Sequence, residues 1–365
     1  MTKNDLHSKP FDEATLTKLD IFQQYAAAWI PTFVMQAAPR LYIFDFFAGS
    51  GADSQGIPGS PIRLLTELNK YFQHIIAKNV RVYLHFNDIS QKKIILLEKT
   101  CETFFAEHPD LRKAITIEYS HQDFEKSFND NYTLISKYPS LVFIDQSGVK
   151  FIEKKYLLEL EKTNQTDFLY FISSSYFWRF GETEEFKKHL PIDINILRDN
   201  PYRFIHRTLL AKLKSFLPID SKLKLYPFSL KKGSNIYGIV FGAKHLRAVE
   251  KFLSIGWKIN GINGDANFDI DQDQSKRQID AFDDHNKTKL ELFQELLEKS
   301  IMNGFLTTNT DIYKFSLALG HPPKHASEYL RQLKREGKVS FEGSSPKVTF
   351  EALKDKNIVE VEYID

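Results

Sequence analysis

The chain has 365 residues, with 49 Lys and Arg against 47 Asp and Glu, and a formal net charge of +2. This length exceeds the size at which one hydrophobic core stops growing, so it predicts about two domains. A nearly neutral chain has no strong long-range field to attract a polyanion, so any nucleic-acid contact must come from local basic patches.

The single cysteine, Cys101, excludes an internal disulfide and a cysteine-rich metal site, and the sequence indicates no other metal site. The first residues contain no apolar run of the signal-peptide type, and no later run approaches the roughly 20 apolar residues of a membrane span. We therefore expect a cytoplasmic protein without a membrane segment.

An N-terminal segment, residues 1–38, is predicted to contain one long helix. Apolar residues recur at helical spacing from residue 13 until Pro31 interrupts the pattern. We expect this helix to cover the first strand.

From Leu41 onward, apolar runs alternate with amphipathic stretches, as in a series of strand and helix units. The apolar runs occupy residues 41–51, 80–88, 114–123, 140–148 and 167–175. The helical stretches occupy residues 61–78, 92–107, 125–136, 151–162 and 183–190. This alternation predicts a parallel sheet with helices on both faces.

Two further strands, at 221–232 and 235–245, are separated by a short turn around Gly233. They predict an antiparallel hairpin at the sheet edge. A seven-stranded sheet with such a final hairpin is the Rossmann-type α/β layout of the class I methyltransferases. We assign it to residues 39–264.

Residues 265–286 are rich in aspartate and poor in apolar residues, which predicts an acidic linker. Helices are then expected at 287–305, at 308–320 with Thr308 or Asn309 as the cap, and at 322–337. Residues 338–350 have the pattern of a strand, a turn and a strand. Together these elements predict a C-terminal winged helix-turn-helix domain over residues 287–365.

The turn after the first strand has the sequence DFFAGSG. Small residues here let the backbone approach a ligand closely, and the following helix N-terminus favours a carboxylate or phosphate. Such a turn also serves simply to pack a helix against its strand. The candidate cofactor-binding residues of this turn are Asp45, Ala48, Gly49 and Gly51.

Two more acids follow the next two strands. Asp88 is placed to accept hydrogen bonds from both ribose hydroxyls of a nucleoside cofactor, and Asp123 to accept one from an adenine amino group. Each alone is more often a helix cap or a turn residue. Together with Asp45 they mark a site at the C-terminal edge of the sheet, and S-adenosylmethionine is the predicted cofactor. An NAD-dependent oxidoreductase would share these features, but the chain contains no second substrate domain of suitable size.

The fourth strand ends in FIDQSG. In amino-methylating enzymes, an Asp or Asn at this position precedes two prolines and an aromatic residue. Its side chain and a neighbouring carbonyl accept hydrogen bonds from the target amine, and the aromatic ring stacks on the base. Here Gln146, Ser147 and Gly148 follow Asp145 instead. Asp145 and Ser147 are the candidate catalytic residues. The alternative is that Asp145 only caps the next helix.

Basic and aromatic side chains form further candidate surfaces. Seven basic residues follow or lie on the final hairpin, from Lys222 to Arg247. The candidate nucleic-acid-binding residues of the third winged-domain helix are Lys324, His325, Arg331, Lys334 and Arg335. An ordinary solvated helix face would have the same pattern. After the fifth strand, Tyr176, Phe177 and Trp178 are placed to stack on a base or to fill the core.

The motifs DFFAGSG, GIPGSPIR, FIDQSG, SSYFWRF and YGIVFGAKH, with residues 308–339, together resemble the three-Cys-motif partner proteins. The resemblance spans Thr17 to about Val348. It implies an S-adenosylmethionine-dependent methyltransferase fold, encoded beside an iron-sulfur protein that carries the three-cysteine motif and is the expected partner. The family usually has Asp-Pro-aromatic-Gly at strand four, so Gln146 and Ser147 are departures.

Two functions therefore remain open. One is methyl transfer to a nucleic acid, together with the iron-sulfur partner. The other is a catalytically inactive recognition or scaffold subunit of a complex in phage defence or DNA repair.

Overall fold

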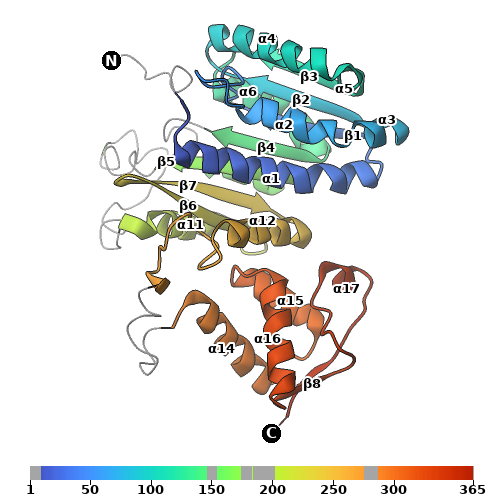
Figure 1. Ribbon diagram of the computed structural model, residues 1–365, viewed down its shortest axis with the longest axis vertical. Coiled ribbons are helices and arrows are strands. Elements are labelled where there is room, and N and C mark those ends of the chain that lie inside the picture. Colours follow the sequence, from blue (N-terminus) through green and yellow to red (C-terminus); the bar gives the residue numbers. More distant parts are fainter. Residues whose placement is uncertain (1–9, 146–153, 174–182, 184–201, 275–286, 365) are drawn as a thin grey trace. The chain divides into compact units, whose positions relative to one another are not determined.

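The computed structural model describes residues 10–145, 154–173, 183, 202–274 and 287–364 (Figure 1). The predicted helix at 183–190 lies outside these residues except for Thr183, and so do Ser147 and the aromatic residues 176–178. The chain divides into two compact units, Met1–Lys244 and His245–Asp365.

The first unit is built on a seven-stranded sheet in the order β3-β2-β1-β4-β5-β7-β6. The strands are β1 (Arg40–Asp45), β2 (Arg81–Asn87), β3 (Ile115–Ser120), β4 (Ser140–Asp145), β5 (Thr166–Ser173), β6 (Lys224–Lys232) and β7 (Asn235–Ala243). Strands β1 to β5 are parallel, and β7 is antiparallel to both of its neighbours. The predicted strands, their final hairpin and the α/β methyltransferase-like fold class are confirmed.

The helices of this unit follow the predicted alternation. They are α1 (Glu13–Met35), α2 (Ser60–Asn69), α3 (Phe72–Ala77), α4 (Gln91–Glu107), α5 (Pro109–Ala114), α6 (Phe124–Lys137), α7 (Lys154–Lys162) and α11 (Ile205–Ser215), with a short 3₁₀ turn at Tyr202–Phe204. The single helix predicted at 61–78 is two helices in the structure. Pro31 does not end α1, because Ile30 and Val34 on either side of it are buried and their packing stabilises the helix beyond the proline.

The sheet is covered on both faces. On one face, Phe44, Val142 and Phe168 belong to a buried cluster with residues of α6, α7 and α11. The other face receives α1, whose Phe22 stacks on Phe143 of β4 with ring centroids 4.3 Å apart. Since β1 and β4 are neighbours and the chain proceeds outward from them in both directions, the switch point of the sheet lies between their carboxyl ends.

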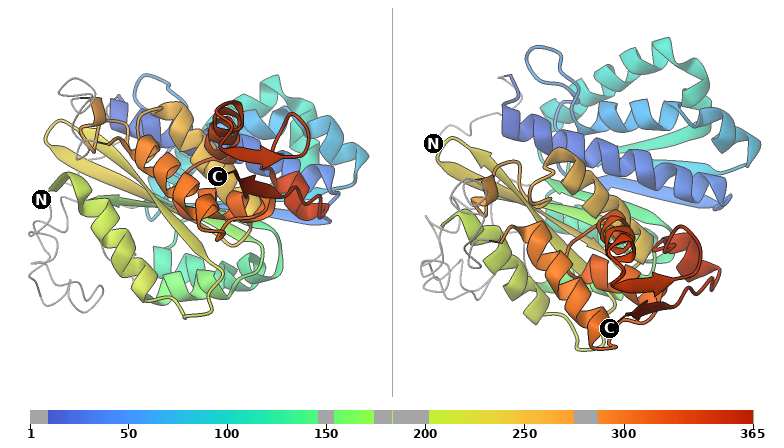
Figure 2. Two further views of the ribbon diagram at one scale, coloured as in Figure 1. Left: turned by 90° about the horizontal axis from the view of Figure 1, so that it is seen from below. Right: turned by 60° about the horizontal axis from the view of Figure 1, so that its bottom comes forward.

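The second unit contains α12 (Leu246–Ile259), α14 (Lys289–Met302), α15 (Asn309–Ala318), α16 (Pro323–Arg335), β8 (Val339–Phe341), α17 (Phe350–Lys354) and β9 (Val361–Tyr363). The segments from α14 to the C-terminus, orange to red in Figure 2, include the three helices of the predicted winged domain. Thr308 is the cap of α15, and its hydroxyl accepts a hydrogen bond from the Asp311 amide.

The predicted hairpin within residues 338–350 is wrong. Strand β8 pairs with β9, at Val361–Tyr363, and the segment predicted as the second strand leads into α17. Lys347 adopts a positive φ of 49°, which interrupts an extended strand, and Thr349 caps α17 by accepting a hydrogen bond from the Ala352 amide.

The second unit begins earlier than the sequence predicted. Helix α12 belongs to it, because Tyr313 of α15 donates to Glu250 and the Trp257 indole donates to the Gly320 carbonyl. Residues 265–274, assigned to the linker, are also packed here: Ile270 is fully buried, and the buried Asp273 accepts the Lys289 amide at 3.0 Å.

Candidate functional site

The glycine turn after β1 lies at the carboxyl edge of the sheet. Gly49 and Gly51 have φ values of 66° and 85°, in the left-handed region that favours glycine. A Cβ atom on Gly51 would lie 2.9 Å from Cδ1 of Leu97, so a side chain there would also force the Leu97 side chain to shift. Within the described part of the chain, the amides of Gly49 and Ser50 donate to no protein acceptor. They are therefore available to a ligand.

Asp45, the last residue of β1, holds this turn in place through two hydrogen bonds. Its carboxylate accepts a hydrogen bond from the Ser60 hydroxyl at 2.6 Å and another from the Phe47 amide at 3.1 Å. It is 1% exposed. Burial raises the pKa of Asp45 to about 7, although these two hydrogen bonds lower it. Asp45, predicted as a cofactor ligand, thus joins the end of β1 to the start of α2.

The loop between the turn and α2 folds back onto the turn. Asp53 accepts hydrogen bonds from the amides of Gln55 and Ile57, both at 2.8 Å, and from the Phe11 amide at 2.7 Å. The Gly59 amide donates to the Gly51 carbonyl at 2.8 Å. The sequence analysis did not single out Asp53, whose only signal was its position in this polar loop.

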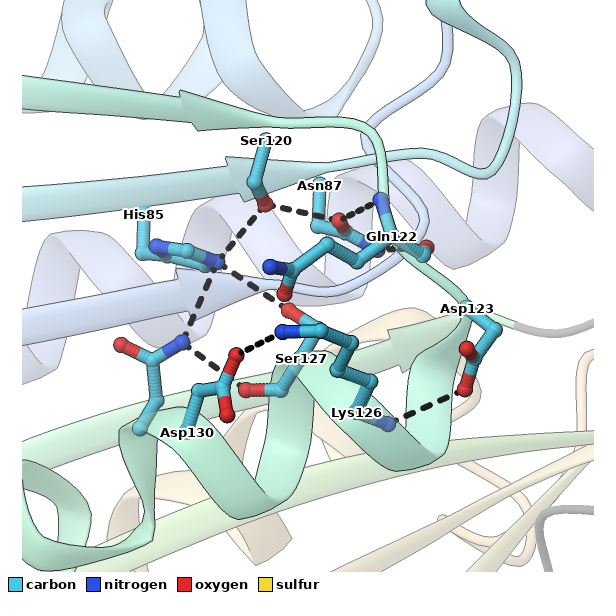
Figure 3. A network of polar contacts seen from close by, with 9 residues as sticks. His85, Asn87, Ser120, Gln122, Asp123, Lys126, Ser127 and Asp130 are labelled. Carbon is cyan, nitrogen blue, oxygen red and sulfur yellow. Dashed lines mark hydrogen bonds and ion pairs between the residues drawn. The ribbon is translucent and has the colours of Figure 1, made fainter.

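Asn87, the last residue of β2, connects three segments of the edge (Figure 3). Its side-chain oxygen accepts from the Ser120 hydroxyl at 2.7 Å and from the Gln122 amide at 3.0 Å. The Ala48 amide donates to the main-chain carbonyl of Asn87 at 2.8 Å. The buried Asn87 therefore sets the positions of the glycine turn and the end of β3. Ala48 is 2% exposed, and its amide is used within the protein.

His85 supports the same edge from within β2 (Figure 3). Its Nε2 atom lies 3.1 Å from the Ser120 hydroxyl and 3.2 Å from the Ser127 hydroxyl. Burial lowers the pKa of His85, while Glu118 opposes this shift. The network connects β2, β3 and α6 close to the predicted site acids Asp88 and Asp123.

The two predicted nucleoside acids differ in their surroundings. Asp88 is 7% exposed; one oxygen accepts the Ser90 amide at 2.9 Å, and the other lies 3.8 Å from Nζ of Lys93, beyond hydrogen-bond distance. That second oxygen can accept a ligand hydroxyl. Asp123 is exposed and caps α6, since it accepts the Lys126 amide at 3.0 Å (Figure 3).

Asp145, at the tip of β4, is paired with a residue that the sequence analysis missed. The ammonium of Lys18, from α1, forms a hydrogen-bonded ion pair with its carboxylate. Lys18 is 5% exposed, and its Nζ atom lies 4.4 Å from the centroid of the Phe171 ring. A lysine in an amphipathic helix looks like a solvent-facing residue, so the sequence carried no signal for this contact.

The residues predicted on α16 separate into two groups. Lys324, Arg331 and Arg335 are exposed and share the outward face with Glu328, which lies 3.5 Å from Lys324. His325 and Lys334 instead make contacts within the unit. The His325 ring lies 3.0 Å from a nitrogen of His321, and Lys334 donates to the carbonyls of Phe341 and Gly343 at 2.6 and 2.9 Å.

Residues 265–346 match the family model described as the GMT-like wHTH domain. This match covers part of the second unit, without α12, α17 and β9, and none of the sheet, whose assignment depends on its strand order.

Two solved structures are similar to part of the chain. One is the O-methyltransferase from Bacillus cereus in complex with SAH, with 10% identity, a TM-score of 0.31, and coverage of 64% of this chain and 91% of that one. The other is a putative rRNA-methylase from Clostridium thermocellum, with 12% identity, the same TM-score, and coverage of 64% and 100%. No curated protein matches the chain.

The described residues contain no cluster of three or more His, Cys, Asp or Glu side chains that could hold a metal ion. Among the helices of the same residues, none has the length and apolar composition to cross a membrane.

Asp45→Asn is expected to gain stability relative to the wild type as the pH rises from about 4 to about 7. The wild-type pKa is raised from 3.8 to about 7 on folding. The unfolded chain therefore releases this proton first, and the wild type loses stability through that window. Melting temperatures between pH 4 and 8 would measure the difference.

Asp130→Asn is the matched control, because the hydrogen bond from Lys126 lowers the pKa of Asp130. The melting temperature of Asp130→Asn should not rise relative to that of the wild type between pH 4 and 8. If the melting temperatures of Asp45→Asn and the wild type differ by the same amount at every pH, Asp45 is ionised in the folded protein.

Proposed function

We propose that this chain binds S-adenosylmethionine at the carboxyl edge of its sheet and transfers the methyl group to a nucleic acid. The observation that carries the proposal is the glycine turn at the switch point. The Gly49 and Ser50 amides of this turn have no acceptor among the described residues, and they lie on the same edge as the second carboxylate oxygen of Asp88. Open α/β sheets bind ligands at this place.

The residues of the edge fit the chemistry of the cofactor. The amides of Gly49 and Ser50 suit a carboxylate, and the glycines that the positive φ favours at 49 and 51 have no side chains to obstruct it. The Asp88 carboxylate suits the ribose hydroxyls, and the exposed Asp123 suits an adenine amino group. When bound, the cofactor supplies an electrophilic methyl group on a sulfonium.

The chain's own contribution is mainly alignment. Asp45 and Asn87 hold the turn and the strand ends in fixed positions through buried hydrogen bonds. Such fixed geometry lowers the entropic barrier for bringing a methyl donor and an acceptor together. The outward face of α16 supplies the nucleic-acid contact in this proposal, and the iron-sulfur protein implied by the family resemblance is the proposed partner.

A catalytically inactive scaffold subunit is the second candidate function. One observation favours it: Asp145, the acid at the position where amino-methylating enzymes hold their target, is already paired with Lys18. In this case the sheet unit would recognise the iron-sulfur partner or a nucleoside without transferring a methyl group.

Calorimetric titration with S-adenosylhomocysteine tests the proposal. We expect the wild type to bind, and Asp88→Ala to bind about tenfold more weakly or worse, because hydrogen bonds to a charged group are worth about 1.5 to 3 kcal/mol. Asp110→Ala is the control, because Asp110 is an exposed acid on α5. It should bind as the wild type does. No heat and no change in melting temperature at millimolar ligand would rule out cofactor binding and methyl transfer.

A further inference from the structure

The first turns of α1 are attached to the carboxyl edge of the sheet. Asp12, the N-cap of α1, forms an ion pair with Lys232 at the end of β6. Just before it, the Phe11 amide donates to Asp53 in the loop after the glycine turn. These contacts place the start of α1, drawn in blue in Figure 1, beside the candidate site.

Lys18 projects from this part of α1 into the protein. Its side chain is 7% exposed and that of Asp145 is 21% exposed, so the ion pair between them is largely removed from water. The ammonium also lies against the ring of Phe171, which stacks on Tyr237 with centroids 5.7 Å apart. Three strands, β4, β5 and β7, therefore contribute to the surroundings of one lysine.

Asp45 belongs to the same group of charges. Burial has the largest effect on the pKa of Asp45, and its two hydrogen bonds come next. The charge of Asp145 then raises this pKa, and the charge of Lys18 lowers it. Among the described residues, the two acids at the carboxyl ends of β1 and β4, which flank the switch point, thus share the charge of Lys18 from α1. Electrostatic interactions of this kind are much stronger in a buried site than in water.

We propose that Lys18 is a positioning residue of the β4 tip: it holds and neutralises Asp145, and so determines how strongly the site prefers a positively charged sulfonium over a neutral thioether. The inference rests on the proposed function and deepens it. An amine acceptor that needs Asp145 must first displace Lys18.

This role predicts opposite effects for the two partners of the ion pair. Without the ammonium, the Asp145 charge is uncompensated and attracts a cation at the switch point. Without the carboxylate, the Lys18 charge is uncompensated and repels it. When both charges are removed, the site returns to about its original charge.

Calorimetric titrations of the full chain with S-adenosylmethionine and with S-adenosylhomocysteine test this. The quantity compared is the ratio of the Kd for S-adenosylhomocysteine to the Kd for S-adenosylmethionine. We expect Lys18→Met to raise this ratio by about threefold to tenfold and Asp145→Asn to lower it by a similar factor. The double variant should return near the wild-type ratio. Lys18→Arg, which keeps the charge, should also retain it.

A purely structural role for Lys18 would change stability and both affinities together, and it would leave the ratio unchanged. Equal ratios in Lys18→Met, Asp145→Asn and the wild type would therefore overturn this inference while the proposed function stands. If the wild type binds neither ligand, the proposed function fails and this inference fails with it. Should Lys18→Met not fold, the lowered ratio of Asp145→Asn decides the question alone.

Discussion

Gly242→Ala is expected to destabilise the sheet unit by about 3 kcal/mol, at the upper end of the cost of forcing extra atoms into a packed core. A Cβ atom on Gly242 would lie 2.0 Å from Cζ of Phe168 and 2.5 Å from two other ring atoms. Phe168 is its direct partner across the β5 and β7 pair, and it is fully buried. The ring lies over the glycine, and the core leaves it little room to move.

Urea unfolding followed by circular dichroism measures this cost. Gly261→Ala is the control, since a Cβ atom there has only one ordinary contact, 3.8 Å from the Trp257 carbonyl oxygen. Its stability should change by less than about 1 kcal/mol. Adding Phe168→Leu to Gly242→Ala should recover part of the loss. An unchanged urea midpoint for Gly242→Ala would mean that the ring moves at little cost.

The strands of the sheet were predictable because the signal is local. A strand buried on both faces is a continuous apolar run, and each such run was followed by small or polar residues where the strand ends. The same pattern located Asp88 and Asp145 at strand ends. It also located the glycine turn, since a positive φ at Gly49 and Gly51 selects glycine in the sequence itself.

Contacts between distant segments were not predictable in this way. Strand β8 pairs with β9 rather than with the residues that follow it, and nothing near β8 encodes that partner. The Lys18 and Asp145 pair joins residues 127 positions apart. The many aspartates of residues 265–286 predicted a linker. Asp273 is nevertheless buried, and the hydrogen bond that it accepts from the Lys289 amide compensates its burial. Composition identified the residue type and not its partner.

Arg331→Glu is expected to weaken nucleic-acid binding by the full chain about tenfold or more. Arg331 lies on the outward face of α16 with Lys324 and Arg335, where a recognition helix contacts phosphates. Reversing its charge removes one phosphate contact and adds a repulsion. The affinity of the wild type should also fall steeply between about 50 and 200 mM salt, with a smaller slope in the variant. Fluorescence anisotropy with duplex and single-stranded DNA and RNA measures both effects.

Glu328 provides the stronger discrimination between nucleic-acid binding and protein docking. It lies among the three basic residues and within 3.5 Å of Lys324, so it opposes a phosphate on this face. If α16 contacts nucleic acid, Glu328→Gln should bind more tightly and Arg331→Glu more weakly. Lys299→Glu, an exposed residue of α14 paired with Glu295, is the charge-matched control and should have little effect. If α16 docks on a protein, Glu328 can instead pair with a basic residue of that protein, and removing its charge should weaken capture of the proposed iron-sulfur partner. Absence of binding to every nucleic acid below about 100 micromolar at low salt, with loss of partner capture in Glu328→Gln, would contradict the nucleic-acid role of this face.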